Sequence, residues 1–150
     1  MNDEAKARAL KILEKRDVSR KMLMDKLMEK GISEADACEV ADWLTELRVI
    51  DDERYAGLVV RHYAGKGYGE RRIREELYHR GVPREYWEAA LEEMPEQDDT
   101  LERFIRSRLR GAEPNSENLR KITNALLRRG HSWEDIHAAA EHVRDRKSVV

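Results

Sequence analysis

Three glycines recur along the chain at intervals of 50 and 49 residues, at Gly31, Gly81 and Gly130. Each is preceded by aliphatic residues four and eight positions earlier, the spacing of the apolar stripe of an amphipathic helix. Each also suits the position that ends a helix in a left-handed conformation. A repeat of this length predicts tandem helical units. The aliphatic pairs are Leu23 and Leu27, Ile73 and Leu77, and Ile122 and Leu126.

A second amphipathic helix is predicted after each glycine. Ser33 and Ser132 each stand three positions before an acidic residue, a spacing close to a capping box. Pro83 suits the first position of the corresponding helix in the middle unit. Apolar residues then recur with helical spacing of four and three. They are Ala37, Ala41 and Leu44, then Trp87, Leu91 and Met94, then Ile136, Ala140 and Val143.

A further helix precedes each pair, at about residues 3–15, 52–64 and 99–110, and Asp51 or Asp52 is expected to cap the middle one. Ser19, Gly69 and Asn118 stand twelve positions before the three glycines and are expected to cap the helices that lead to them. No segment shows the alternating apolar pattern that would predict a β-strand instead. The sequence predicts an all-α, elongated tandem array of three three-helix repeats, with bounds at residues 1–50, 51–97 and 98–150.

The charge of the chain alternates in blocks along this repeat. Although the net charge is only −2, residues 61–81 sum to +3 and residues 101–130 to +5, whereas residues 31–60 and 82–100 each sum to −6. Residues 1–30 also sum to +3. The segment before each glycine is therefore basic, and in the first two units the helix after it is acidic. A helix-turn-helix protein places its second helix in the DNA major groove, where acidic side chains are repelled by phosphate. Ordinary operator recognition is disfavoured.

The outer stripe of each basic helix supplies candidate contact residues. In the middle unit it carries Arg71, Arg74 and Tyr78. The corresponding stripes begin with Lys21 in the first unit and Arg120 in the third. An alternative remains open, in which Arg71 and Arg72 pair with Glu75 and Glu76 four residues later on a solvated helix face.

The sequence lacks the patterns of an enzyme or a metal protein. The five histidines have no cysteine or carboxylate set at metal-ligand spacing, and no nucleophile elbow or nucleotide-binding loop is present. We therefore expect a non-enzymatic protein without a cofactor or metal. The single cysteine, Cys38, favours a reducing compartment, and no apolar run approaches the length of a membrane span. A cytoplasmic location, away from membranes, is expected.

Residues 50–82, IDDERYAGLVVRHYAGKGYGERRIREELYHRGV, resemble the central signature of the RecX family. Its recognisable parts are the acidic start followed by Arg54 and Tyr55, the KGYG turn, the Arg72–Ile73 pair and the closing RGV. The serine-initiated helix that ends at Lys30 also matches the family pattern. The resemblance covers residues 5–94 well and the last third mainly through the repeat.

The resemblance implies a non-enzymatic regulator of the RecA recombinase in DNA recombination, DNA repair and the SOS response. Such a protein would bind the RecA filament on single-stranded DNA and inhibit its ATP hydrolysis and strand exchange. Several modest contacts from one chain would favour the filament over the free subunit. The resemblance implies a partner-binding role for the residues at the matching motif positions. We add to them the residues on the outer stripes of the basic helices. The complete set is Lys66, Tyr68, Arg71, Arg72, Arg74, Tyr78, Lys21 and Arg120.

Two other functional classes remain open. A helical module that binds DNA directly, through weak contacts with phosphates, would act on naked DNA with a steep salt dependence and without a recombinase. A helical scaffold would use its charged faces only to keep the repeats soluble. A monomer is expected, because an array that is already multivalent within one chain has little need to dimerise.

Overall fold

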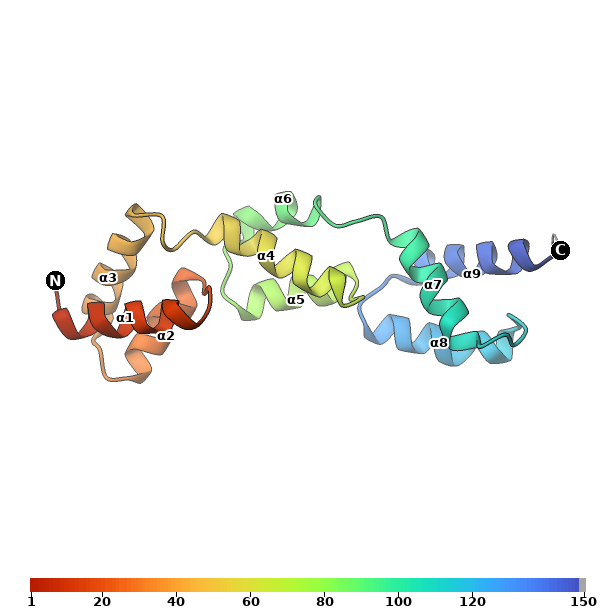
Figure 1. The fold of residues 1–150 in the computed structure, drawn as a ribbon, viewed down its shortest axis with the longest axis horizontal. Helices are drawn as coiled ribbons and strands as arrows, with labels where there is room; N and C mark the ends of the chain where they lie inside the picture. Colours follow the sequence, from red (N-terminus) through yellow and green to blue (C-terminus); the bar gives the residue numbers. More distant parts are fainter. Residues whose placement is uncertain (149–150) are drawn as a thin grey trace. The chain divides into compact units, whose positions relative to one another are not determined.

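A computed structural model describes residues 1–148, which form nine α-helices and one short 3-10 helix without any strand (Figure 1). The expected all-α class is confirmed. The chain divides into two compact units, residues 1–60 with 75–93 and residues 61–74 with 94–150. The division passes through α4 (Asp52–Gly65) and α5 (Glu70–His79).

The first unit begins with three helices that pack on one another. Its remaining helical segments are the first part of α4, the last part of α5, a 3-10 helix and α6. The bounds are Asp3–Lys15 for α1, Arg20–Glu29 for α2, Glu34–Glu46 for α3, Arg84–Tyr86 for the 3-10 helix and Trp87–Leu91 for α6.

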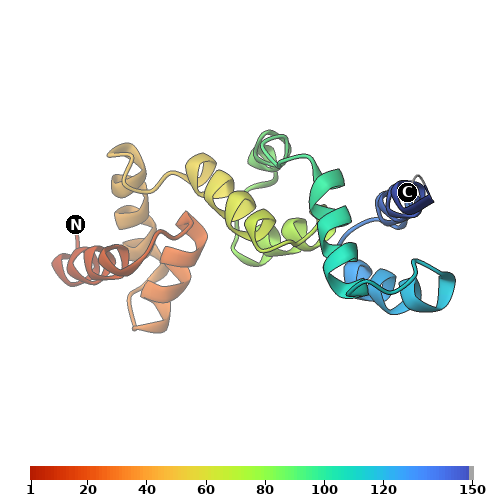
Figure 2. The ribbon, with the colours of Figure 1, turned by 45° about the vertical axis from the view of Figure 1, so that its right-hand side comes forward.

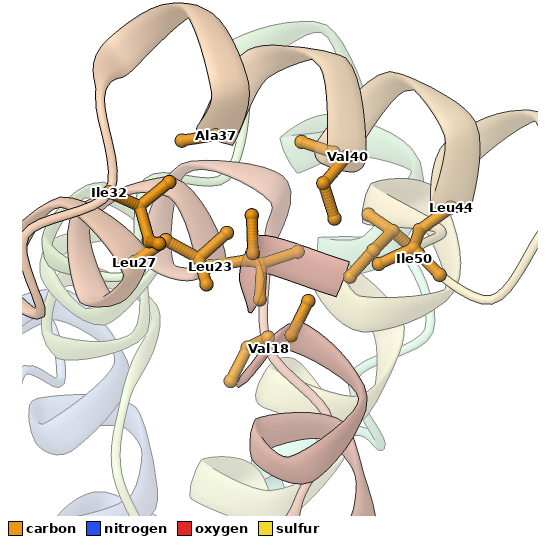
Figure 3. Close-up of a cluster of buried hydrophobic side chains, with 11 residues drawn as sticks. Val18, Leu23, Leu27, Ile32, Ala37, Val40, Leu44 and Ile50 are labelled. Atoms are coloured by element: carbon orange, nitrogen blue, oxygen red, sulfur yellow. The ribbon is translucent and has the colours of Figure 1, made fainter. Parts of the chain in front are cut away.

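The core of α1, α2 and α3 is formed by the predicted apolar stripe (Figure 3). Leu23 and Leu27 from α2 are fully buried, and they face Val40 and Leu44 from α3. Truncating a buried leucine to alanine costs about 2–5 kcal/mol, so each of the three leucines contributes substantially to the stability of this core. Val18, Ile32, Ala37 and Ile50 complete the part of the cluster that the figure identifies.

Side chains at the helix starts of the first unit act largely as expected. The hydroxyl groups of Ser19 and Ser33 accept from the amides of Met22 and Asp36, each at 3.1 Å. The Asp51 carboxylate accepts from the Arg54 amide at 3.1 Å and therefore caps α4. Of the two aspartates considered for that cap, Asp52 instead accepts from the Arg20 amide (2.9 Å) at the start of α2, and burial raises the pKa of its carboxyl group.

The helix after Gly81 differs from its prediction. Pro83 stands before the first helical residue, and a 3-10 turn precedes the five residues of α6. Helix α6 ends at Leu91, so Met94 lies beyond the stripe to which it was assigned. Trp87 is buried as expected, and its indole N–H donates to the Val82 carbonyl at 2.8 Å.

The second unit contains three long helices, which Figure 2 shows in teal, light blue and dark blue. Helix α7 packs on both α8 and α9 around Leu101, Ile105, Ile122 and Ile136. Asn118 is not the expected cap, because α8 begins earlier and the Asn115 side chain accepts from the Asn118 amide at 2.8 Å. The bounds are Gln97–Leu109 for α7, Ser116–Arg128 for α8 and Trp133–Ser148 for α9.

The three repeated glycines have positive φ angles of 90°, 71° and 94°, which confirms the predicted left-handed helix ends at Gly31, Gly81 and Gly130. Among the helices of residues 1–148, none is both long enough and apolar enough to cross a membrane.

Candidate interaction surface

The KGYG turn contacts the turn between α8 and α9 within the second unit. The Gly69 amide donates to the Arg129 carbonyl at 2.8 Å, and the Arg71 amide donates to the Gly130 carbonyl at 3.2 Å. A Cβ atom on Gly69 would lie 2.5 Å from Gly130 and His131 backbone atoms. Glycine is therefore required where these two backbones approach.

Two arginine side chains extend this contact. The Arg71 guanidinium donates to the Leu127 carbonyl at 2.8 Å, and the Arg129 guanidinium donates to the Lys66 carbonyl at 3.0 Å. Charge-assisted hydrogen bonds of this kind are stronger than neutral ones. The candidate residues Lys66 and Arg71 thus serve the folding of this chain, a role that sequence reasoning did not assign to them.

Tyr68 lies between cationic groups at the same turn. The Arg72 and Arg129 guanidinium carbons lie 5.5 and 5.6 Å from the centre of its ring. The Tyr63 ring meets it edge-on at 5.7 Å. The tyrosine is half-buried, and attraction between each guanidinium and its ring face contributes about 0.5–2 kcal/mol.

His131 is buried beside the turn, with 6% of its surface exposed. One ring nitrogen, Nε2, lies 2.9 Å from the Gly67 carbonyl oxygen, which fits a neutral ring that donates to this carbonyl. Burial lowers the pKa of the imidazole, and the hydrogen bond to Gly67 opposes this effect. Burial of the ring beside the turn therefore favours its neutral form.

Two further candidates lie on α5. Arg74 pairs with Glu70 one turn earlier, at 3.6 Å. Tyr78 is 64% exposed, and its ring meets that of His79 edge-on. Tyr78 therefore remains accessible to a partner, and it combines a large apolar surface with a polar tip, as side chains at binding sites often do.

The first unit contains the candidate Lys21, next to a contact between α2 and the end of α5. The buried Ser19 hydroxyl donates to the Arg80 carbonyl, and Arg80 Nη1 donates to the Tyr55 hydroxyl at 2.9 Å. The stem of Lys21 lies against Gly81, at 2.7 Å from where a Cβ atom would stand, and its ammonium group pairs with Asp25 at 3.2 Å.

Arg120 lies exposed on α8 in the second unit. The structure therefore brings Lys66, Tyr68, Arg71 and Arg72 together at one turn, and Arg74 follows on α5. Lys21 and Tyr78 belong to the other unit. The binding roles of all eight candidates stay predictions.

Sequence reasoning missed Arg129 and His131, which complete the contact at the KGYG turn. Gly130 was recognised as a helix end. The sequence repeat predicts the helices within each repeat unit, but it does not predict which turns of different repeats contact each other. Within residues 1–148, no group of three or more histidine, cysteine, aspartate or glutamate side chains could hold a metal ion.

Comparison with known families and proteins gives consistent matches. A family model described as "RecX, first three-helix domain" matches residues 5–44, and one described as "RecX, second three-helix domain" matches residues 51–91. A protein of Xanthomonas axonopodis pv. citri (strain 306), named "Regulatory protein RecX", is 40% identical over 135 residues, which cover 88% of this chain and 83% of that protein. A protein of the same name from Vibrio campbellii is 32% identical over 137 residues, covering 90% and 88% of the two chains.

Solved structures agree with the fold. The crystal structure of RecX from Lactobacillus salivarius matches with a TM-score of 0.85 at 24% identity, covering 94% of this chain and 95% of that one. A second crystal structure of a regulatory protein RecX matches with a TM-score of 0.79 at 22% identity, covering 95% and 72% of the two chains. Together with the domain matches, these likenesses confirm an all-α chain of tandem three-helix domains.

Proposed function

This chain belongs to the RecX family of regulatory proteins, and from that premise we propose that it binds the RecA recombinase filament on single-stranded DNA and restrains its ATP hydrolysis and strand exchange. It would act from the cytoplasm as a monomer, without a catalytic step, cofactor or metal of its own. The observation that supports this most strongly is the match to both three-helix domains of the family, over residues 5–44 and 51–91.

The division into three repeats, at residues 1–50, 51–97 and 98–150, is part of the proposal. Each repeat would place its basic helix, α2, α5 or α8, against acidic recombinase surface or DNA phosphate. The summed contacts would then favour a filament, which presents many identical subunits, over the single subunit.

The eight candidate residues would contribute in two ways. Lys21, Arg74, Tyr78 and Arg120 would contact the partner through their side chains. Lys66, Tyr68 and Arg71 would act mainly by holding the KGYG turn against the α8–α9 turn, through the Lys66 carbonyl, the Tyr68 ring and the Arg71 guanidinium. Arg72 would support them through its contact with the Tyr68 ring.

The direct test is ATP hydrolysis by the cognate RecA on single-stranded DNA, titrated with this protein. Inhibition is expected well below one regulator per RecA subunit, because one chain would contact several subunits. The double substitution Arg74→Ala and Tyr78→Ala is expected to raise the concentration for half inhibition about five- to tenfold. Glu34→Ala with Glu46→Ala, two exposed positions on α3, is the matched control and is expected to inhibit like the wild type.

Absence of inhibition by the intact protein would overturn the proposed function. The competing reading, a module that binds DNA on its own, is tested in the same series by titrating naked single-stranded DNA without RecA at several salt concentrations. Tight binding there, with a steep loss as salt rises and no effect on RecA, would favour that reading instead.

A further inference from the structure

A groove of about 630 Å³ lies between α1 and α2 in the first unit, and its walls are mostly cationic. The residues from α1 that line it follow one face of the helix, so their side chains converge on the groove. Ala7 and Ile12 contribute apolar surface, and two acidic residues, Glu4 and Glu29, also line it. The cations are Arg8, Lys11, Lys15, Arg16, Lys26 and Lys30.

These cations are poorly compensated within the chain. Arg8 pairs with Glu4 at 3.1 Å, but within residues 1–148 the structure records no ion pair for the other five. Of the acids near the groove, Asp17 pairs with Arg54 and Asp25 with Lys21, so the groove's two lining acids, Glu4 and Glu29, stand against six cations. Lys11 and Lys15 are like charges four residues apart on α1, an unfavourable arrangement for the free protein, and Lys26 on α2 stands four residues before Lys30, the residue that ends this helix.

A groove at the corresponding place in the second unit has a different character. Between α7 and α8, a groove of about 250 Å³ is lined by two cations, Arg108 and Lys121, among mainly apolar residues. The helical packing therefore produces a depression between these helices without requiring cationic walls. The six cations are therefore specific to the α1–α2 groove and are not a consequence of how the helices pack.

The lining of the α1–α2 groove favours an acidic peptide over nucleic acid. Sites for single-stranded nucleic acid combine cations with aromatic rings on which bases stack, and the residues that line this groove include no aromatic side chain. Four of the six cations are lysines, whose ammonium groups act as point charges on long flexible stems and suit carboxylates at varied spacing. The apolar surface of Ala7 and Ile12 would accept an aliphatic side chain between those carboxylates.

We propose that the α1–α2 groove binds an acidic peptide segment of a partner protein, with its carboxylates on the lysines and an aliphatic side chain on Ile12. The residues that line the groove include none of the eight candidates discussed above, and the proposal does not depend on the proposed function. Carboxylates bound among the lysines would attract them and would also reduce the repulsion between neighbouring lysines. Both effects would favour association.

The test measures fluorescence anisotropy of a labelled peptide of about twelve residues, in which glutamates flank two leucines, against the full chain. Lys11→Glu with Lys26→Glu is expected to weaken binding about tenfold or more, because attraction is replaced by repulsion on both walls. Arg106→Glu with Arg128→Glu changes the net charge equally at exposed positions outside the groove, and is expected to bind within about twofold of wild type.

Two further measurements make the result decisive. Lys11→Arg with Lys26→Arg keeps the charges and is expected to retain binding, and helical melts of all variants exclude a folding effect. A peptide with glutamine for glutamate is expected not to bind. Equal weakening by both charge-reversal pairs, or no binding of the acidic peptide, would overturn the proposal. Binding of an oligothymidine in place of the peptide, lost in the groove variant, would assign the groove to nucleic acid instead.

Discussion

Gly69 lies so close to Gly130 that a Cβ atom on Gly69 would fall 2.5 Å from the Gly130 carbonyl carbon and oxygen. The converse also holds, because a Cβ atom on Gly130 would fall 2.5 Å from the Arg72 amide nitrogen. The two turns therefore meet backbone to backbone, joined by the hydrogen bonds from Gly69 and Arg71. Backbone atoms cannot rotate away as a side chain can, so the contact requires two glycines.

Gly69→Ala is therefore expected to destabilise the contact between the KGYG turn and the α8–α9 turn. The added methyl forces the backbones apart and weakens their hydrogen bonds, at a cost of about 1–3 kcal/mol. Gly65→Ala is the matched control, since a Cβ atom there meets nothing within 4 Å and alanine favours the last turn of α4. Urea unfolding measures the difference, and an equal effect of the two substitutions would contradict the close approach seen at Gly69.

Alanine substitutions at Gly31 and Gly130 allow the cost of backbone strain to be distinguished from the cost of a steric clash. Their φ angles are nearly equal, at 90° and 94°, but a Cβ atom on Gly31 meets nothing within 4 Å. Gly31→Ala is expected to cost about 1–3 kcal/mol from the conformation alone. Gly130→Ala is expected to cost more, by about another 1–3 kcal/mol, because it adds the clash with Arg72. Urea unfolding of both variants checks this order, which equal losses would contradict.

Much of the fold could be predicted from the sequence because it depends on local rules. The spacing of Leu23 and Leu27 identified a buried helix face, and the serine at position 33 identified a helix start. The error at Asn118 has a local cause. The loop before α8 is longer than in the other repeats, and Asn115 offers an equally good cap three residues earlier.

The candidate site could be predicted less well. Arg71 was compared with Glu75, a neighbour along the helix, but its guanidinium donates to Leu127, which lies 56 residues away in the chain. Sequence periodicity describes which face of a helix is apolar, whereas a contact between turns depends on how helices from different repeats pack. The position of His131 beside Gly67 could not be predicted for the same reason.

Ser19 and Ser33 are expected to differ in their contributions to stability, although both cap helices. The Ser33 hydroxyl is exposed and accepts one amide hydrogen bond, so Ser33→Ala should cost about 1 kcal/mol. Ser19 is fully buried, and its hydroxyl also donates to the Arg80 carbonyl. Ser19→Ala leaves that carbonyl without its donor, so a total loss of about 2–4 kcal/mol is expected. Thermal unfolding of the two variants provides the comparison, and equal losses would show that the Arg80 bond contributes nothing.

His131 is expected to make stability depend on pH below about 6.5, the ordinary pKa of histidine. Burial lowers its pKa in the folded chain, so the unfolded chain binds the proton first as pH falls. Stability is therefore fully present above the unfolded pKa and is lost as pH falls toward the folded pKa. The slope for one proton is at most about 1.4 kcal/mol per pH unit.

Urea unfolding between pH 5 and pH 8 measures this slope. His131→Gln retains an amide donor for the Gly67 carbonyl but cannot titrate, so the loss of stability at low pH should shrink. His137→Gln is the matched control, because that imidazole is exposed and stacks on Trp133. An unchanged slope in His131→Gln would contradict the assignment to His131.

Among the carboxylates of the second unit, Glu102 is expected to contribute most to stability, so its removal should lower the free energy of unfolding most. Its side chain is only 5% exposed, yet it pairs with His142 Nδ1 at 2.9 Å and Arg146 Nη1 at 3.0 Å, which joins α7 to α9. Glu102→Gln preserves the shape but removes the charge, and the loss of two charge-assisted bonds at a buried group should cost about 1–3 kcal/mol. Glu4→Gln, which breaks the exposed pair with Arg8, should change stability by less than about 0.5 kcal/mol. Urea unfolding at neutral pH compares the two variants, and equal losses would show that burial adds nothing to the Glu102 pairs.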